Sequence, residues 1–194
     1  MTDEQLVLSL QSGDTDSLGI LVSRWERPLH RFVFRMLPRQ EDARDITQET
    51  FLRILKKSDR FKEGSRFSTW MYQIALNLCR DHLRHRRRWG LLFAKGHEPD
   101  DAREAPLDSG SDFDPSLTAE RREMCSVVNQ ALARIPTQQR EVLILKEYEG
   151  LKFKEIAEIL HCPESTVKSR MYYGLNTLRA ELARRGVTAA ATER

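Results

Sequence analysis

One stretch near the end of the chain gathers hydrogen-bonding, cationic and aromatic side chains at helical spacing. Val167, Met171 and Leu175 recur at the three- and four-residue spacing of a helix that buries one face. The opposite face then carries Ser165, Lys168, Ser169, Tyr172 and Asn176, with Arg170 and Tyr173 beside it. Hydroxyl, ammonium and ring groups contact base edges and phosphates when a helix enters a major groove. No acidic residue lies between Ser165 and Tyr173, which favours DNA contact over a merely solvated face.

Two shorter amphipathic segments precede this helix. Their apolar residues are Val142, Leu143, Leu145 and Tyr148, followed by Phe153, Ile156, Ala157 and Leu160. Gly150 stands where a helix C-terminus tolerates a positive φ, and Pro163 fits a first helical position. The pattern predicts a helix-turn-helix, and the alternative is a helical hairpin with a solvated polar face.

A second candidate surface lies on a helix expected over roughly 41–57. Its buried face is predicted to hold Ala43, Ile46, Thr47, Phe51, Ile54 and Leu55. A separate face carries Asp42, Asp45, Gln48, Glu49 and Leu52. The helix dipole accounts for acid in the first turn, but not for Glu49 or for an exposed Leu52. An acidic face that includes an apolar residue suits docking onto a basic partner surface.

The third candidate combines aromatic rings with arginines. A loop is predicted over 61–69 because Gly64 and Ser65 interrupt the helical pattern, and Ser68 is a fair N-cap for the next helix. The rings are Phe61, Phe67, Trp70 and Tyr72, and the cations that follow are Arg80, Arg84, Arg86, Arg87 and Arg88. Single-stranded nucleic-acid sites combine rings that stack on bases with cations that follow phosphates. The alternative is that the rings are core, which is the better interpretation for Phe61 or Trp70 alone.

The remaining sequence predicts an all-helical chain of two domains. Among 194 residues with a net charge of +3, Pro and Gly are scarce and no alternating run of β-branched residues indicates a strand. A capping box at 2–5 opens a first helix that ends at Gly13, and a second helix is expected to kink or break near Arg27, before Pro28. The acidic, Pro-rich stretch 96–118 predicts a flexible linker between domains 1–95 and 119–185, and 186–194 predicts a tail.

Several classes of function are not indicated. No apolar run approaches the roughly 20 residues that span a bilayer, and the N-terminus lacks a basic signal region, so a cytoplasmic protein is expected. Cys79, Cys125 and Cys162 form an odd set that argues against a disulfide framework. Cys79, His82 and His85 lack a fourth ligand for zinc, so packing is preferred. With no acid/base pair, nucleophile or phosphate loop, neither an enzyme nor a cofactor is expected.

Three segments in fixed order resemble the extracytoplasmic-function (ECF) group of the sigma-70 family. DARDITQETFLRIL is similar to the signature of region two, and RFSTWMYQIALNLCRDHLRHRRR is similar to the segment that opens and reads the minus-ten element. IPTQQREVLILKEYEGLKFKEIAEILHCPESTVKSRMYYGLNTLR resembles region four, which reads the minus-thirty-five element. The resemblance spans the chain except for the linker and tail. It implies a factor that binds core RNA polymerase and directs it to promoters.

The resemblance also implies roles for individual residues. The face that grips the β′ clamp helices of the polymerase would be Asp42, Asp45, Gln48, Glu49 and Leu52. Minus-ten recognition and melting would fall to Phe61, Arg66, Phe67, Ser68, Thr69, Trp70, Tyr72, Asn77, Arg80 and Arg84. Minus-thirty-five recognition would use Ser165, Thr166, Lys168, Ser169, Arg170, Tyr172 and Tyr173. Further implied partners are the β flap and an anti-sigma factor in a stress or envelope response, without membrane insertion.

Two positions depart from the family pattern. Lys152 stands where a Ser or Thr often precedes the scaffold helix, and Tyr173-Gly174 replaces a frequent Arg-Ala in the recognition helix. The rival functions are a stand-alone helix-turn-helix regulator and a helical protein-binding adaptor. A dimeric regulator needs a self-association face, for which the sequence offers no further amphipathic stripe. An adaptor would not need the cluster Arg84–Arg88 beside Trp70.

Overall fold

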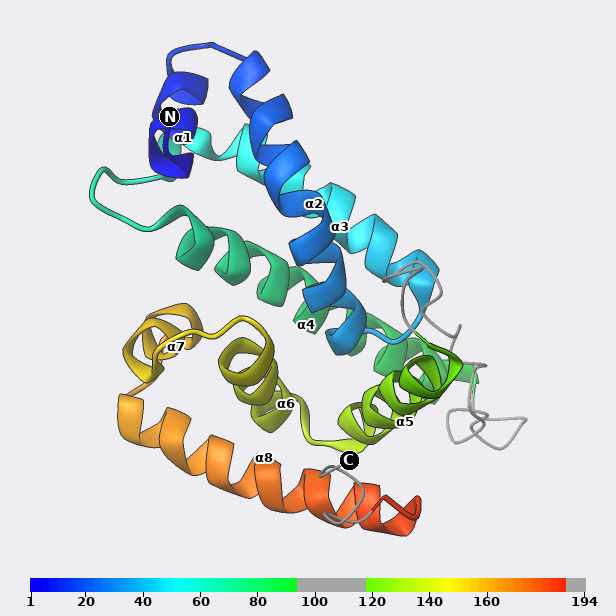
Figure 1. Cartoon of the computed structure of the whole chain (residues 1–194). Helices are drawn as coiled ribbons and strands as arrows, with labels where there is room; N and C mark the ends of the chain where they lie inside the picture. Colours follow the sequence, from blue (N-terminus) through cyan, green and yellow to red (C-terminus); the bar gives the residue numbers. More distant parts are fainter. Residues whose placement is uncertain (94–117, 188–194) are drawn as a thin grey trace. The chain divides into compact units, whose positions relative to one another are not determined.

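The computed structural model describes residues 1–93 and 118–187, and over these ranges the chain is built from helices without strands (Figure 1). The all-helical prediction is therefore confirmed. The predicted linker lies almost wholly outside the described residues, as does most of the predicted tail. The chain divides into two compact units, Met1–Val33 with Glu41–Pro106 and Phe34–Gln40 with Leu107–Arg194.

The first unit is built on four helices and one short 3-10 turn. They are α1 (Asp3–Gln11), α2 (Asp16–Met36), α3 (Gln40–Lys56), η1 (Ser58–Arg60) and α4 (Phe67–Phe93). The exceptions are the end of α2 from Phe34 onward and the first residue of α3, Gln40, which fall in the second unit. Thr2 and Gln5 form the predicted capping box of α1, and Gly13 follows the helix with a φ of 97°. Of the kink or break predicted near Arg27, the break does not occur, because α2 continues through Pro28 as one helix. The loss of a single backbone hydrogen bond at Pro28 is outweighed by the buried stripe on either side of it, which includes Leu21 and Phe32.

The core of the first unit draws on all four helices. Fully buried side chains include Leu6 and Val7 of α1, Leu29 and Phe32 of α2, Ile54 of α3, and Met71 and Ala75 of α4. Each fully buried aliphatic or aromatic side chain contributes roughly 1.5–3 kcal/mol to folding. This shared core fixes the faces of α3 and α4 that remain exposed.

The second unit contains the predicted helix-turn-helix. Its elements are α5 (Ala119–Arg134), α6 (Thr137–Leu143), a π-helical turn η3 (Ile144–Tyr148), α7 (Phe153–Leu160) and α8 (Glu164–Arg184). α8 packs against α5, α6 and α7. The π turn was not predicted: the amide of Glu149 donates to the carbonyl of Ile144 at 3.2 Å, five residues back. Ile144 and Leu145 of this turn are buried together, while Tyr148 is 42% exposed with the guanidinium of Arg35 lying 3.9 Å from the centre of its ring.

Within the described ranges, no helix has both the length and the apolar character needed to cross a membrane. The same ranges contain no group of three or more His, Cys, Asp or Glu side chains placed to hold a metal ion. Of the three residues weighed as metal ligands, Cys79 is buried, His82 faces Asp42, and His85 accepts a hydrogen bond from the indole of Trp89 at 2.7 Å.

Candidate nucleic-acid and protein interfaces

A tight turn sets the angle between α7 and α8. His161 ends α7 in the left-handed conformation, with a φ of 52°. Pro163 is the N-cap of α8, one residue before the first helical position predicted for it, and α8 begins at Glu164. Lys152 cannot accept a hydrogen bond through its ammonium group, so the start of α7 has only half a capping box. That half is the carboxylate of Glu155, which accepts the amide of Lys152 at 2.7 Å.

Two of the three side chains predicted to face inward on α8, Val167 and Met171, are buried. The third, Leu175, is half buried, and Gly174 beside it is buried instead. The exposed residues are Ser165, Lys168, Ser169, Tyr172, Tyr173 and Asn176. Tyr172 and Tyr173 are 64% and 59% exposed, and their rings meet edge to face with centroids 5.6 Å apart. Two large rings held in solvent next to hydroxyls and a cation form a surface suited to base edges, sugars and phosphates.

Lys168 is less free than the sequence indicated. Its ammonium lies 2.7 Å from a carboxylate oxygen of Glu164, one turn earlier on the same helix. The signal was the i,i+4 spacing of the two residues, which pairs opposite charges on a helix surface. Because both side chains are about half exposed, solvent weakens the pair, and a phosphate could replace the carboxylate. Glu164 is therefore a further residue of this surface, and the sequence interpretation missed it.

Two residues at the border of this face, Thr166 and Arg170, are half buried. Arg170 lies 3.8 Å from the sulfur of Cys162, through one guanidinium nitrogen. Thr166 is partly buried, and its carbonyl accepts the hydroxyl of Ser169 at 3.0 Å. Arg170 and Thr166 thus border the exposed face instead of projecting from its centre.

Gly174 explains the departure from the family pattern in this helix. It is buried where α8 meets α6, and a Cβ atom added there would lie 3.1 Å from Leu143 Cδ1 and 3.3 Å from the Cβ of Gln139. Real Cβ contacts are rarely this short, so glycine allows the two helices their present approach. The preceding Tyr173 remains outside, in solvent.

The acidic face of α3 is exposed around Asp45, Gln48 and Leu52. Leu52 is 48% exposed, and Leu55, which was predicted to be buried, is also exposed. Glu49 is half buried and pairs with Arg53 at 2.9 Å. The face therefore combines carboxylate, amide and apolar groups on adjacent turns of one helix.

Asp42 does not share this face in the way that the sequence indicated. Its carboxylate lies 3.2 Å from Nε2 of His82 and 3.8 Å from Arg86, both on α4, and its side chain is only 18% exposed. The reason is its position at the start of α3, beside the buried Ala43, where α4 approaches. Asp42 is thus placed to join α3 to α4 within the unit.

The rings around the 61–69 segment are mostly core. Phe61, Phe67 and Tyr72 are 4%, 0% and 2% exposed, so the expectation that these rings face a base does not fit their placement. Phe67 packs edge-on against Trp25 with centroids 5.9 Å apart, and Phe61 packs against the half-exposed Trp70 at 5.3 Å. Burial of so much aromatic surface stabilises the segment.

What remains accessible around this segment is polar and cationic. Arg66 is exposed, while Ser68 and Thr69 are half exposed at the start of α4. The helix begins at Phe67, so Ser68 lies inside it and is not its N-cap, contrary to prediction. Further along α4, Asn77 is exposed and Arg80 is half buried. Arg84 is exposed and pairs with Asp81 one turn away.

Comparison with known proteins follows the same two-part division. Residues 21–89 match the family model for Sigma-70 region 2, and residues 126–178 match that for Sigma-70, region 4. The chain is 31% identical over 179 residues to the RNA polymerase sigma-H factor of Pseudomonas aeruginosa, covering 88% of each chain. It is 32% identical over 181 residues to the ECF RNA polymerase sigma-E factor of Escherichia coli K12, covering 89% of this chain and 90% of that one.

Two solved structures share the fold. CnrH in complex with the cytosolic domain of CnrY has a TM-score of 0.68 at 24% identity, over 94% of this chain and 97% of that chain. The sigma factor RpoE in complex with the anti-sigma factor NepR from Bartonella quintana has a TM-score of 0.66, also at 24% identity, over 85% of this chain and 96% of that chain.

Proposed function

The chain belongs to the sigma-70 family as an extracytoplasmic-function sigma factor, and we propose that three of its surfaces divide the work of promoter-directed initiation. Binding to core RNA polymerase, recognition and opening of the minus-ten element, and recognition of the minus-thirty-five element each fall to one of them. The single observation that carries this division is the exposed face of α8, where Lys168, Tyr172 and Tyr173 project opposite a buried stripe.

The polymerase-binding surface is centred on Asp45, Gln48 and Leu52 of α3, with Glu49 beside them. An exposed leucine flanked by acid supports docking onto a basic, partly apolar partner surface, here the β′ clamp helices. Asp42 contributes indirectly, because its contacts with α4 hold the start of α3 in place. The second unit would contact the β flap of the polymerase, as the family resemblance implies.

Minus-ten recognition centres on the segment between η1 and α4 and on the first turn of α4. Arg66, Ser68, Thr69 and the half-exposed edge of Trp70 are its accessible groups. Removing a base from the duplex costs a few kcal/mol of lost stacking and pairing. Polar groups beside an aromatic edge can offset part of that cost. Phe61, Phe67 and Tyr72 shape this segment from beneath. Asn77, the half-buried Arg80 and the exposed Arg84 extend the surface along α4, where cationic side chains suit the phosphates of the opened strand.

Minus-thirty-five recognition uses α8 in a major groove. Ser165, Lys168 and Ser169 occupy the first two turns of the helix, the part that approaches base edges in helix-turn-helix proteins. Tyr172 and Tyr173 follow on the next turn, and Thr166 and Arg170 border the face. A tyrosine in place of the frequent arginine supplies apolar contact where a charge would otherwise meet phosphate.

Regulation completes the proposal. CnrH and RpoE, which share the fold, were each solved in complex with a second protein, CnrY and the anti-sigma factor NepR respectively. We assign this chain an anti-sigma partner as well, together with a role in a stress or envelope response and a cytoplasmic location beside RNA polymerase. No enzymatic activity of its own is part of the proposal.

In vitro transcription with purified core polymerase tests the proposal. The full chain is expected to confer promoter-specific transcripts that core polymerase alone does not make, and Leu52→Asp should abolish them by removing core binding. A chain that binds promoter DNA without core polymerase and yields no transcript would instead be a stand-alone helix-turn-helix regulator. A chain that binds neither would be an adaptor.

A further inference from the structure

Helix α1 contacts both ends of the segment that joins η1 to α4. The side-chain amide of Gln11 donates two hydrogen bonds, to the carbonyl of Ser58 at 2.7 Å and to that of Phe61 at 2.9 Å. Gln11 is the last residue of α1. Near the start of the same helix, the carboxylate of Glu4 accepts a hydrogen bond from the amide of Phe67 at 3.1 Å. One short helix thus fixes the entry and the exit of this segment.

The bond from Phe67 is a helix cap supplied from another element. The amide of Phe67 belongs to the first turn of α4, where backbone donors have no partner within the helix. A carboxylate at this end is also favoured by the helix dipole. The hydrogen bond from Phe67 is the largest cause that holds the pKa of Glu4 below its ordinary value. Glu4 is therefore charged at neutral pH, and the bond is charge-assisted.

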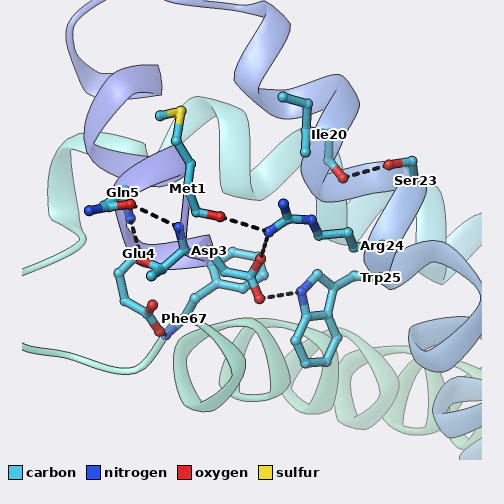
Figure 2. A network of polar contacts seen from close by, with 10 residues as sticks. Met1, Asp3, Glu4, Gln5, Ile20, Ser23, Arg24, Trp25 and Phe67 are labelled. Atoms are coloured by element: carbon cyan, nitrogen blue, oxygen red, sulfur yellow. Dashed lines mark hydrogen bonds and ion pairs between the residues drawn. The ribbon is translucent and has the colours of Figure 1, made fainter.

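α1 is itself firmly placed on the first unit (Figure 2). Asp3 accepts the indole N–H of Trp25 at 2.9 Å and pairs with Arg24 at 2.8 Å, both on α2. The ring of Trp25 in turn packs edge-on against Phe67. Three apolar side chains of α1 are buried beneath these polar contacts: Leu6, Val7 and Leu10. Gln11 and Glu4 therefore act from a fixed support.

We propose that α1 is a positioning element for promoter opening, in which Gln11 and Glu4 hold the segment 58–67 in the shape that receives an unpaired base. The proposal rests on the function proposed above for that segment. It concerns residues that precede the region-2 match, which begins at residue 21. Gln11 and Glu4 do not touch DNA in this account; they act through the backbone of the segment.

The test compares single variants in full-length holoenzyme. Glu4→Ala removes one hydrogen bond and should slow promoter opening about fivefold, the ratio that corresponds to about 1 kcal/mol. Gln11→Ala removes two and should slow opening by between about fivefold and about thirtyfold, the latter corresponding to about 2 kcal/mol. Opening is followed by permanganate reactivity of unpaired thymines, at polymerase concentrations that saturate the closed complex. Glu4→Gln keeps an acceptor oxygen at the same position and should restore most of the rate. A premelted bubble template should restore wild-type transcription for every variant.

Two matched controls separate positioning from general destabilisation. Gln5→Ala removes one hydrogen bond of the α1 capping box, the one from the backbone amide of Thr2 to the side-chain oxygen of Gln5. It leaves the contacts of Glu4 and Gln11 with the segment in place. Glu26→Ala removes a carboxylate from an exposed position on α2. Both should open promoters at the wild-type rate.

The outcomes distinguish this inference from the function on which it rests. If Ser68→Ala and Thr69→Ala slow opening while Glu4→Ala and Gln11→Ala do not, the role of α1 is refuted and that of the segment stands. If the α1 variants stay slow on a premelted template, or if Gln5→Ala is equally slow, their defect is one of folding and the inference is refuted. If Ser68→Ala and Thr69→Ala open promoters normally, the proposed function of the segment fails, and the inference fails with it.

Discussion

Gly174→Ala should destabilise the second unit, although alanine is the better helix former. Replacing a helical glycine with alanine ordinarily contributes about 1 kcal/mol of stability. Here the new methyl group would lie 3.1 and 3.2 Å from the Cδ1 and Cγ atoms of Leu143 and 3.3 Å from the Cβ of Gln139. The Leu143 side chain is almost fully buried, so it has little room to move aside. The Cβ of Gln139 is fixed to its backbone and cannot rotate away.

The magnitude follows from these opposing terms. Inserting a methyl group into a packed contact costs roughly 1–3 kcal/mol, so the net loss is expected to be up to about 2 kcal/mol. Gly19 provides the matched control, because it also lies inside a helix but has no atom within 4 Å of its added Cβ. Gly19→Ala should therefore stabilise the first unit by about 0.5–1 kcal/mol.

The assay can follow the two units separately. All three tryptophans, Trp25, Trp70 and Trp89, lie in the first unit, so their fluorescence during urea unfolding reports on Gly19→Ala. Hydrogen exchange of the amides of α6 and α8 reports on Gly174→Ala. Opposite signs for the same substitution at the two sites are the expected result. Equal or greater protection of α6 and α8 in Gly174→Ala would refute the close-approach reasoning.

Three further predictions concern the other surfaces and the support beneath them. Where they contact bases, Lys168→Ala and Tyr172→Ala should each weaken binding to the minus-thirty-five element by about 1–3 kcal/mol, with core binding unchanged. Fluorescence anisotropy on specific and scrambled duplexes measures the DNA affinity, and variants that bind the element as tightly as wild type would exclude the assigned face. Asp45→Lys should reduce retention of core polymerase in a pull-down by adding repulsion, whereas Asp42→Asn should mainly lower the unfolding temperature. An equal loss of core binding in both variants would contradict the separation of their roles. The lowered folded pKa of Glu4 means that its contribution to stability is present above the ordinary value of 4.5 and is lost as the pH falls through the folded value. The stability difference between wild type and Glu4→Gln should therefore shrink on acidification through that range, and a difference that grows would show the opposite sign.

Periodic apolar spacing was sufficient to predict most of the fold. Most of the stripes of α3 and α8, and the turn after Leu160, follow from spacing and from residues with special backbone preferences, although Leu55 of α3 is exposed and Leu175 of α8 is half buried. The exposed face of α8 was predictable because Val167 and Met171 mark the opposite, buried face. The π turn at Ile144–Tyr148 was not, since an apolar run gives no signal for one extra residue in a turn.

Local spacing also failed where a distant element decides the environment. The rings of Phe61 and Phe67 have the composition of a stacking surface, but packing with Trp25 and Trp70 places them in the core. Asp42 shares a helical face with Asp45 by spacing, yet α4 covers only the first of the two. The contacts of Gln11 with Ser58 and Phe61 join residues about fifty positions apart, which no local pattern can indicate.

The π turn before the helix-turn-helix has a consequence for chain length. A turn closed by five-residue hydrogen bonds holds one residue more than the α-helix it interrupts. Deleting one residue from Ile144–Tyr148 would let ordinary helical bonding continue, and the residues on either side would keep their orientation, because the wider turn is what absorbs the extra residue. The same deletion inside α8 would rotate every later residue of that helix by about 100° around its axis and would break up its exposed face. The π turn is therefore a place in the second unit where the loss of one residue can be accommodated, whereas α8 is not.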